Sequence, residues 1–152
     1  MPLLNLDKFT IKDEPIPAER LASMVEADQT KDLSVQLRDN GYLLLRSVYN
    51  PSDVQAARDE ILKRLAEVGE VAEPISDAIS TGTSDRRLHY PNTKSLGAFW
   101  KSVSEGSALR RVINGPEITG VMEKIFGEKV THFSFAWLRA MQAGKASPVH
   151  ID

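Results

Sequence analysis

Residues 50–70, NPSDVQAARDEILKRLAEVGE, contain the clearest helical pattern in the chain. Ser52 and Gln55 have the spacing of a capping box, in which side chains satisfy the free backbone N–H groups of a first turn. The apolar residues that follow recur every three or four positions and therefore share one helical face: Val54, Ala57, Ile61, Leu65 and Val68. We expect this face to lie in the core and the helix to end at Gly69.

Shorter elements are expected on both sides of this helix. Residues 30–41, TKDLSVQLRDNG, read as a helix that ends at Gly41, because glycine tolerates the left-handed conformation of a C-cap. The apolar run YLLLR at 42–46 is too short for a helix and predicts a strand. Three further helices are expected over residues 96–104, 108–113 and 117–126, the last of them with Pro116 at a tolerated first-turn position and ending at Gly127.

Two regions lack such patterns. Residues 1–29 hold three of the eight prolines and are expected to form a loosely attached N-terminal arm, so that residues 30–152 make up a single domain. Residues 70–93 predict a long irregular loop. Loops of this length in a compact domain are commonly lids or binding loops.

Composition narrows the possible functions. The chain is 41% hydrophobic and 26% charged with a net charge of -2, which is typical of a soluble globular protein. Its basic residues are dispersed, so a nucleic-acid partner is not expected. There is no cysteine, so nitrogen and oxygen atoms would have to hold any metal. No apolar run reaches the roughly 18 residues of a membrane span and no secretory pattern opens the chain, so we expect a cytoplasmic protein without membrane contact. The oligomeric state stays open.

The C-terminal residues have a different character. KVTHFSFAWLRAM, residues 129–141, is aromatic and alternates as a strand does, with Phe133, Phe135, Trp137 and Arg139 on one face. We expect Phe133 and Phe135 to be core aromatics, and His132, on the other face, to be structural. A turn at 143–148 then leads into a second strand, VHID. The chain is therefore predicted to be α+β, with a helical N-terminal region followed by strands.

His150 and Asp152 stand two residues apart on this second predicted strand, so their side chains point to the same side. One imidazole and one carboxylate suit a borderline divalent metal such as iron(II). With a second histidine they form the facial triad of non-haem iron oxygenases, which leaves coordination positions open. The spacing alone also fits a surface histidine and aspartate at a strand end.

Three stretches together resemble the N-terminal part of the phytanoyl-CoA dioxygenase family of iron(II)- and 2-oxoglutarate-dependent oxygenases. The first, LRDNGYLLLRSVYNPSDVQAARDEILKRL (37–65), matches a helix, a Gly-Tyr strand and a long helix. The second, FWKSVSEGSALRRVINGPEITGVMEKIFG (99–127), matches a region of short helices. The third, FAWLRAMQAGKASPVHID (135–152), matches a strand, a glycine-containing turn and the His-x-Asp of the iron site. The matches occur in the order that the family has.

The resemblance implies a double-stranded β-helix, a jelly-roll or cupin-like fold, which this chain begins and does not complete. In the family, a distal histidine and an arginine that binds 2-oxoglutarate come many residues after the His-x-Asp pair. The chain is therefore expected to be the front part of a larger enzyme, truncated at its first metal-ligand motif. On this expectation, the 152 residues are inactive by themselves.

Site roles follow from the same resemblance. His150 and Asp152 are expected to be two of three iron(II) ligands. Arg139 and Trp137, on the strand that enters the site, are expected to contact the cosubstrate 2-oxoglutarate, although a surface salt bridge is an equal reading of Arg139. His89 and Tyr90 are assigned to the mouth of the substrate site, with ordinary loop packing as the alternative.

The implied reaction is the oxidative decarboxylation of 2-oxoglutarate coupled to hydroxylation of a small organic or acyl substrate. Two alternatives remain at the level of the sequence. One is a non-catalytic β-helix scaffold or interaction domain, which would need no iron. The other is a jelly-roll metalloenzyme that does not use 2-oxoglutarate, such as an isomerase. A histidine and then an arginine on later strands would favour the oxygenase.

Overall fold

The computed structural model describes residues 24–138, and this part of the protein is mainly helical. Its elements in chain order are α2 (Leu33–Asn40), α3 (Pro51–Ala66), the 3-10 helix η2 (Ile75–Asp77), α4 (Arg86–His89), α5 (Thr93–Ser104), α6 (Ser107–Ile113) and α7 (Pro116–Phe126). The five main helices lie where the sequence pattern predicts them. Between residues 24 and 138 there is no strand, only the isolated bridges Glu26–Leu44 and Val71–Ser80.

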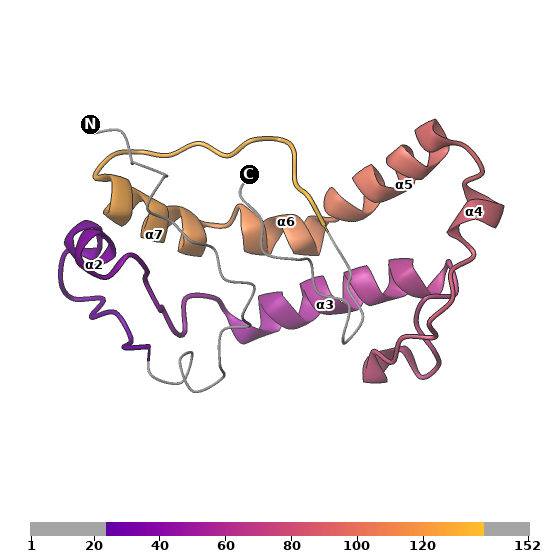
Figure 1. Ribbon diagram of the computed structural model, residues 1–152, viewed down its shortest axis with the longest axis horizontal. Coiled ribbons are helices and arrows are strands. Elements are labelled where there is room, and N and C mark those ends of the chain that lie inside the picture. Colours follow the sequence, from indigo (N-terminus) through magenta and orange to yellow (C-terminus); the bar gives the residue numbers. More distant parts are fainter. Residues whose placement is uncertain (1–23, 139–152) are drawn as a thin grey trace, which may run out of the picture.

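The helices form two rows (Figure 1). The long helix α3 lies along one side, and α7, α6 and α5 follow one another along the other side. Helix α6 packs against α3, and α2 packs against α7. After α7, the chain turns back and passes along the row of α7 and α6 toward α5 (Figure 1).

The N-cap of helix α3 lies two residues before the one that the capping-box interpretation predicts. Asn50 is its N-cap, and Asn50 Oδ1 accepts hydrogen bonds from the backbone N–H of Ser52 at 3.0 Å and from its hydroxyl at 2.9 Å. Gln55 donates to Asp59 instead of returning to the cap. The predicted cap at Ser52 is therefore wrong, because an asparagine before Pro51 already satisfies the first turn. The helix ends at Ala66, before the left-handed Gly69.

The buried face of α3 differs in part from the predicted one. Ala57, Leu65 and Val68 are buried as expected, whereas Val54 is 44% exposed and Leu62 is buried in addition. Sequence periodicity predicts which side of a helix is apolar. That side is buried only where a neighbouring element covers it. The first turn of α3 is not covered at Val54.

The core is centred on Val68, which follows the end of α3, and on Phe99 and Val103 of α5. Partly buried hydrophobic side chains pack around it: Tyr90, Leu96, Trp100 and Leu138. The Tyr90 and Phe99 rings lie 4.7 Å apart between centroids. Residues from four separate stretches of the chain therefore meet in this cluster.

Neither predicted strand in the described part of the protein forms a ladder. In the 42–46 run, Leu44 makes a single parallel bridge, with its carbonyl accepting from Ala27 N–H at 2.9 Å. Residues 129–138 are in no strand, and Phe133 and Phe135 are 90% and 78% exposed, so the prediction that they are core aromatics is wrong. When apolar and polar residues alternate along a strand, the apolar face is buried only if the strand belongs to a sheet and another layer covers that face. The continuation of the predicted strands lies in residues 139–152, outside the described residues.

The predicted loop at 70–93 has more internal structure than its composition indicates. Ala72 N–H donates to Ile79 O at 2.9 Å, and Thr81 N–H donates to Glu70 O at 3.1 Å. The segment also contains η2 and α4, and Arg58 Nη2 on α3 donates to Ser76 O at 2.7 Å. The first two bonds lie within the segment, and the third connects it to the long helix at η2.

Helix α6 is oriented by a carboxylate from α3. Glu60 accepts hydrogen bonds from the backbone N–H groups of Ala108 at 3.3 Å and Leu109 at 3.0 Å, in the first turn of α6. A negative charge at a helix N-terminus is favourable, since the free N–H groups there carry partial positive charge. Gly106 makes the approach possible, because a Cβ atom at that position would collide with the Glu60 carboxylate.

Replacing Leu65 with alanine should lower the free energy of unfolding by about 2–5 kcal/mol, because the side chain is buried in the α3 interface. Val54→Ala is the matched control on the same helix, and its exposed side chain predicts a change of less than about 0.5 kcal/mol. Urea denaturation followed by circular dichroism measures both. Equal losses for the two variants would contradict the assignment of the buried face.

Candidate functional site

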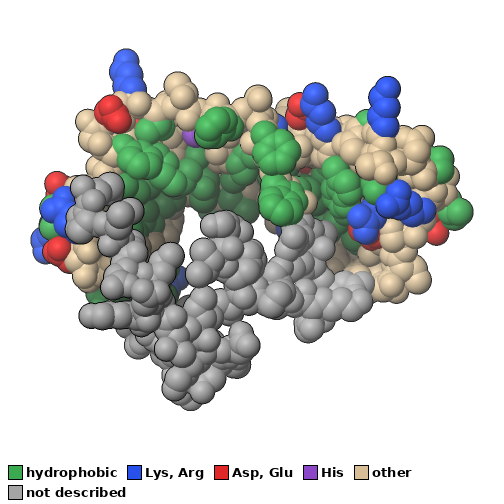
Figure 2. Space-filling model, turned by 45° about the horizontal axis from the view of Figure 1, so that its top comes forward, with side chains coloured by type: hydrophobic (Ala, Val, Ile, Leu, Met, Phe, Trp, Pro, Cys, Tyr) green, Lys and Arg blue, Asp and Glu red, His purple; other side chains and the backbone are tan. Residues whose placement is uncertain are grey.

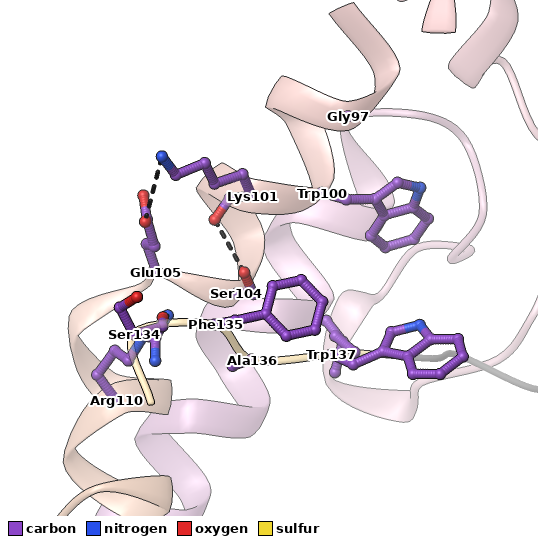
Figure 3. A pocket seen from close by; sticks show the side chains of 11 residues that line it. Gly97, Trp100, Lys101, Ser104, Glu105, Arg110, Ser134, Phe135, Ala136 and Trp137 are labelled. Atoms are coloured by element: carbon purple, nitrogen blue, oxygen red, sulfur yellow. Dashed lines mark hydrogen bonds and ion pairs between the residues drawn. The ribbon is translucent and has the colours of Figure 1, made fainter. Parts of the chain in front are cut away.

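A cavity of about 760 Å³ lies between α5, the start of α6 and the segment after α7 (Figure 3). Its walls come from Gly97, Trp100, Lys101, Ser104, Glu105, Arg110, Ser134, Phe135, Ala136, Trp137 and Leu138. We call it the tryptophan pocket. The volume is within the range of small-molecule sites, about 300–1,000 Å³.

The apolar wall of the tryptophan pocket rests on the core. Trp100 and Leu138 both pack against the central cluster. The Trp100 ring meets the Phe99 ring edge-on, with centroids 5.2 Å apart, and the Arg86 guanidinium lies 4.9 Å from the Trp100 ring centroid. Because Arg86 is also ion-paired with Glu70, the indole is held between fixed neighbours.

The opposite wall consists of exposed aromatic side chains from the segment after α7. Phe135 and Trp137 are 78% and 77% exposed although both line the pocket. Figure 2 shows hydrophobic side chains gathered along the face where this segment crosses the helices. Arg110 on α6 fixes the segment, since its Nη2 donates to the carbonyl of Ser134 at 2.7 Å.

Charged groups collect at one end of the pocket. In Figure 3, Lys101, Glu105 and Arg110 lie toward one end, and the rings of Trp100, Phe135 and Trp137 lie toward the other. Lys101 Nζ is 3.8 Å from Glu105 Oε1. Two cations and one carboxylate leave this end with a net positive charge.

Of the residues that the sequence assigns to a site, the structure places Trp137 in the tryptophan pocket. His89 and Tyr90 do not line it: Tyr90 packs against Phe99, and His89 is exposed with its ring 6.4 Å from that of Tyr90. His132 forms a 2.7 Å hydrogen bond with the hydroxyl of Thr119 on α7, in keeping with a structural role.

The predicted iron ligands His150 and Asp152, and Arg139, lie outside the described residues. Within residues 24–138, no three histidine, aspartate or glutamate side chains are grouped so that they could hold a metal ion. In the same range, no helix has the length and apolar character needed to cross a membrane. The tryptophan pocket is a candidate site that the described residues form by themselves.

Sequence reasoning did not find Trp100, Lys101 or Arg110 as site residues. Helical periodicity assigns them to short helices and gives no sign that α5 and α6 face the segment after α7. The one available signal is compositional. The chain has only two tryptophans, Trp100 and Trp137, and both line the same cavity.

A second charged cluster connects three helices away from the pocket. Arg111 on α6 binds the Glu117 carboxylate of α7 through two nitrogens, at 2.5 and 2.7 Å, and lies 3.1 Å from Asp53 on α3. Hydrogen bonds from Arg111 lower the pKa of Glu117 to about 2, below its ordinary 4.5. In turn, the hydrogen bonds with Glu117 raise the pKa of Arg111.

Glu117→Gln should make thermal stability less sensitive to acid. The folded protein holds Glu117 ionised to lower pH than the unfolded chain does, so this stabilisation is complete above about pH 4.5 and is lost as the pH falls toward 2. The melting temperature of the wild type should fall more between pH 5 and pH 2 than that of the variant. Glu128→Gln, at an exposed position, is the control. Parallel pH curves for Glu117→Gln and wild type would refute the assignment.

Comparisons with known proteins do not assign this chain to a family. No protein-family model matches it, and no match was found among curated proteins or solved structures.

Proposed function

We propose that this chain is the N-terminal portion of an iron(II)- and 2-oxoglutarate-dependent oxygenase similar to the phytanoyl-CoA dioxygenase family, acting in the cytoplasm on a small organic or acyl substrate. The observation that carries the proposal is the His150-Ile151-Asp152 motif in the sequence, which follows an aromatic segment and a predicted glycine-containing turn. A histidine and a carboxylate on one side of a strand are two of the three ligands of a facial triad.

The helical region supports the proposal without testing the chemistry. The resemblance places a long helix and then a group of short helices before the metal motif, and α3 and α5 to α7 follow that order. The double-stranded β-helix belongs to the proposal. The segment after α7 runs as an extended trace (Figure 1), and further strands beside it would supply the hydrogen-bond partners of a sheet.

The donor set fits the metal. The chain contains no cysteine, and an imidazole nitrogen with a carboxylate oxygen suits iron(II). With iron(II) bound, the chemistry available is the decarboxylation of 2-oxoglutarate to succinate coupled to hydroxylation of a substrate C–H bond. In this proposal, His150 and Asp152 hold the metal, Arg139 and Trp137 contact the cosubstrate, and His89 and Tyr90 lie toward the substrate.

Succinate release tests the proposal. The assay uses the complete reading frame with iron(II), ascorbate and 2-oxoglutarate, because the resemblance places the distal histidine and the cosubstrate arginine after the His-x-Asp pair. We expect succinate formation that stops when EDTA removes the metal. Bound iron without succinate would favour the metalloenzyme that does not use 2-oxoglutarate. No bound iron and no succinate with a broad substrate panel would favour the non-catalytic scaffold.

A further inference from the structure

We propose that the tryptophan pocket binds a carboxylate with an apolar body, such as a medium-chain or aromatic acid. The pocket divides into an aromatic part and a positively charged end (Figure 3). A mainly apolar lining with a few polar groups at one place is typical of sites for small molecules. Each half of the pocket selects one half of such a ligand.

The apolar body is selected by the aromatic walls. Trp100 stands on the core, and Phe135 and Trp137 present largely exposed rings on the other side. Transfer of hydrocarbon from water onto such surfaces is favourable in proportion to the area covered. A ligand chain or ring placed between α5 and the segment after α7 would contact both walls at once.

The carboxylate is selected by the charged end. Lys101 and Glu105 form a pair at 3.8 Å and balance each other, so the charge of Arg110 is in excess. A guanidinium has five N–H donors, and the bond from Arg110 Nη2 to Ser134 O uses one of them. Arginine binds carboxylates through paired hydrogen bonds, so the anion is favoured over an ammonium group of the same length.

The arrangement is largely formed before a ligand arrives. Arg110 belongs to α6, whose first turn is fixed by the Glu60 carboxylate, and its bond to Ser134 places the far wall. Groups that are already ordered in the free protein lose less conformational entropy on binding. The pocket therefore meets the ligand with its cation and its aromatic surfaces in place.

This inference rests on the described pocket and not on the proposed oxygenase activity. The pocket residues Lys101 and Arg110 have no part in the iron chemistry proposed above, whereas Trp137 belongs to both proposals. The experiment below uses neither iron nor 2-oxoglutarate. A failed succinate assay would leave it standing, and its own failure would leave the iron proposal standing.

The two tryptophans provide a direct measurement, because both line the pocket. Protein labelled with 5-fluorotryptophan should give two ¹⁹F resonances, which Trp100→Phe and Trp137→Phe assign. Titration with octanoate should shift both resonances in a saturable way. Acetate, which has no apolar body, should shift neither, and octylamine should bind more weakly than octanoate. Equal binding of octanoate and octylamine, or no shift of either resonance, would overturn the proposal.

Charge variants test the carboxylate end. Arg110→Gln should weaken octanoate binding about tenfold and octan-1-ol binding less, because the alcohol loses only the wall that the bond to Ser134 places, whereas the carboxylate also loses its cation. Lys101→Gln, at a side chain that is 73% exposed, should produce a smaller loss of the same kind and guards against misfolding of the first variant. Lys124→Gln on α7 is the control and should leave the affinity for octanoate unchanged. Unchanged octanoate affinity in both charge variants would overturn the proposal.

Discussion

Under the proposed oxygenase function, replacing His150 or Asp152 with alanine in the complete reading frame should reduce 2-oxoglutarate turnover by about a hundredfold or more. Loss of a second-shell partner already lowers metal affinity or activity by about 10–100-fold, and removal of a ligand itself is more severe. The two remaining ligands of a facial triad would hold iron(II) weakly. Succinate release and the iron content of the purified protein are the two measurements, and both should fall together.

His132→Ala is the matched control for His150→Ala. His132 bonds to Thr119 on α7 and is assigned no part in the metal site, so its loss should leave iron content near the wild-type value. If His150→Ala retained full iron content and full succinate release, the His-x-Asp motif would not be the iron site. If His132→Ala removed the iron as well, the ligand assignment would have to be revised.

Replacing Phe99 with alanine should cost about 3–5 kcal/mol of unfolding free energy, the largest stability loss expected in the helical region. The side chain is 2% exposed and touches residues from several elements. The rings of Tyr90 and Trp100 pack against it, and the Arg64 guanidinium lies 5.4 Å from its centroid. Removing the ring leaves a cavity that all three neighbours face.

Phe126→Ala is the matched control for this prediction. Phe126 is the last residue of α7 and is 64% exposed, so its loss should cost less than about 1 kcal/mol. Urea denaturation followed by circular dichroism gives both values. A loss below about 1 kcal/mol for Phe99→Ala would show that the cluster around it is not the core. Because the Trp100 ring packs against the Phe99 ring, Phe99→Ala should also shift the ¹⁹F resonance of 5-fluorotryptophan at position 100.

The helices could be predicted because their signals are local. Gly41 adopts the left-handed C-cap conformation that the sequence predicts, Gly127 adopts the same conformation after α7, and Pro116 opens α7. A helix satisfies its backbone hydrogen bonds within one continuous stretch, so periodicity and end residues largely determine where it forms. The error at Ser52 has the same origin: two polar residues compete for one N-terminus, and geometry selects Asn50.

The strand and core predictions in the C-terminal part depend on partners that a local pattern does not contain. Phe133 and Phe135 alternate as strand residues do, yet in the described part of the protein they lie on the surface. A strand needs a neighbouring strand for its backbone and a covering layer for its apolar face. An alternating pattern predicts which side chains share a face of a strand. It does not predict which other part of the protein, if any, packs against that face.

Local signals in the chain were enough to locate the helices, to exclude thiol ligands and to set His150 and Asp152 two residues apart. Only the tertiary structure decided that Trp100 and Trp137 would line one cavity with Arg110 at its charged end. The physical reason is the range of the interactions. Caps and periodicity act within a few residues, whereas the pocket forms because α6 is fixed to α3 through Glu60 and the returning chain is fixed to α6 through Ser134.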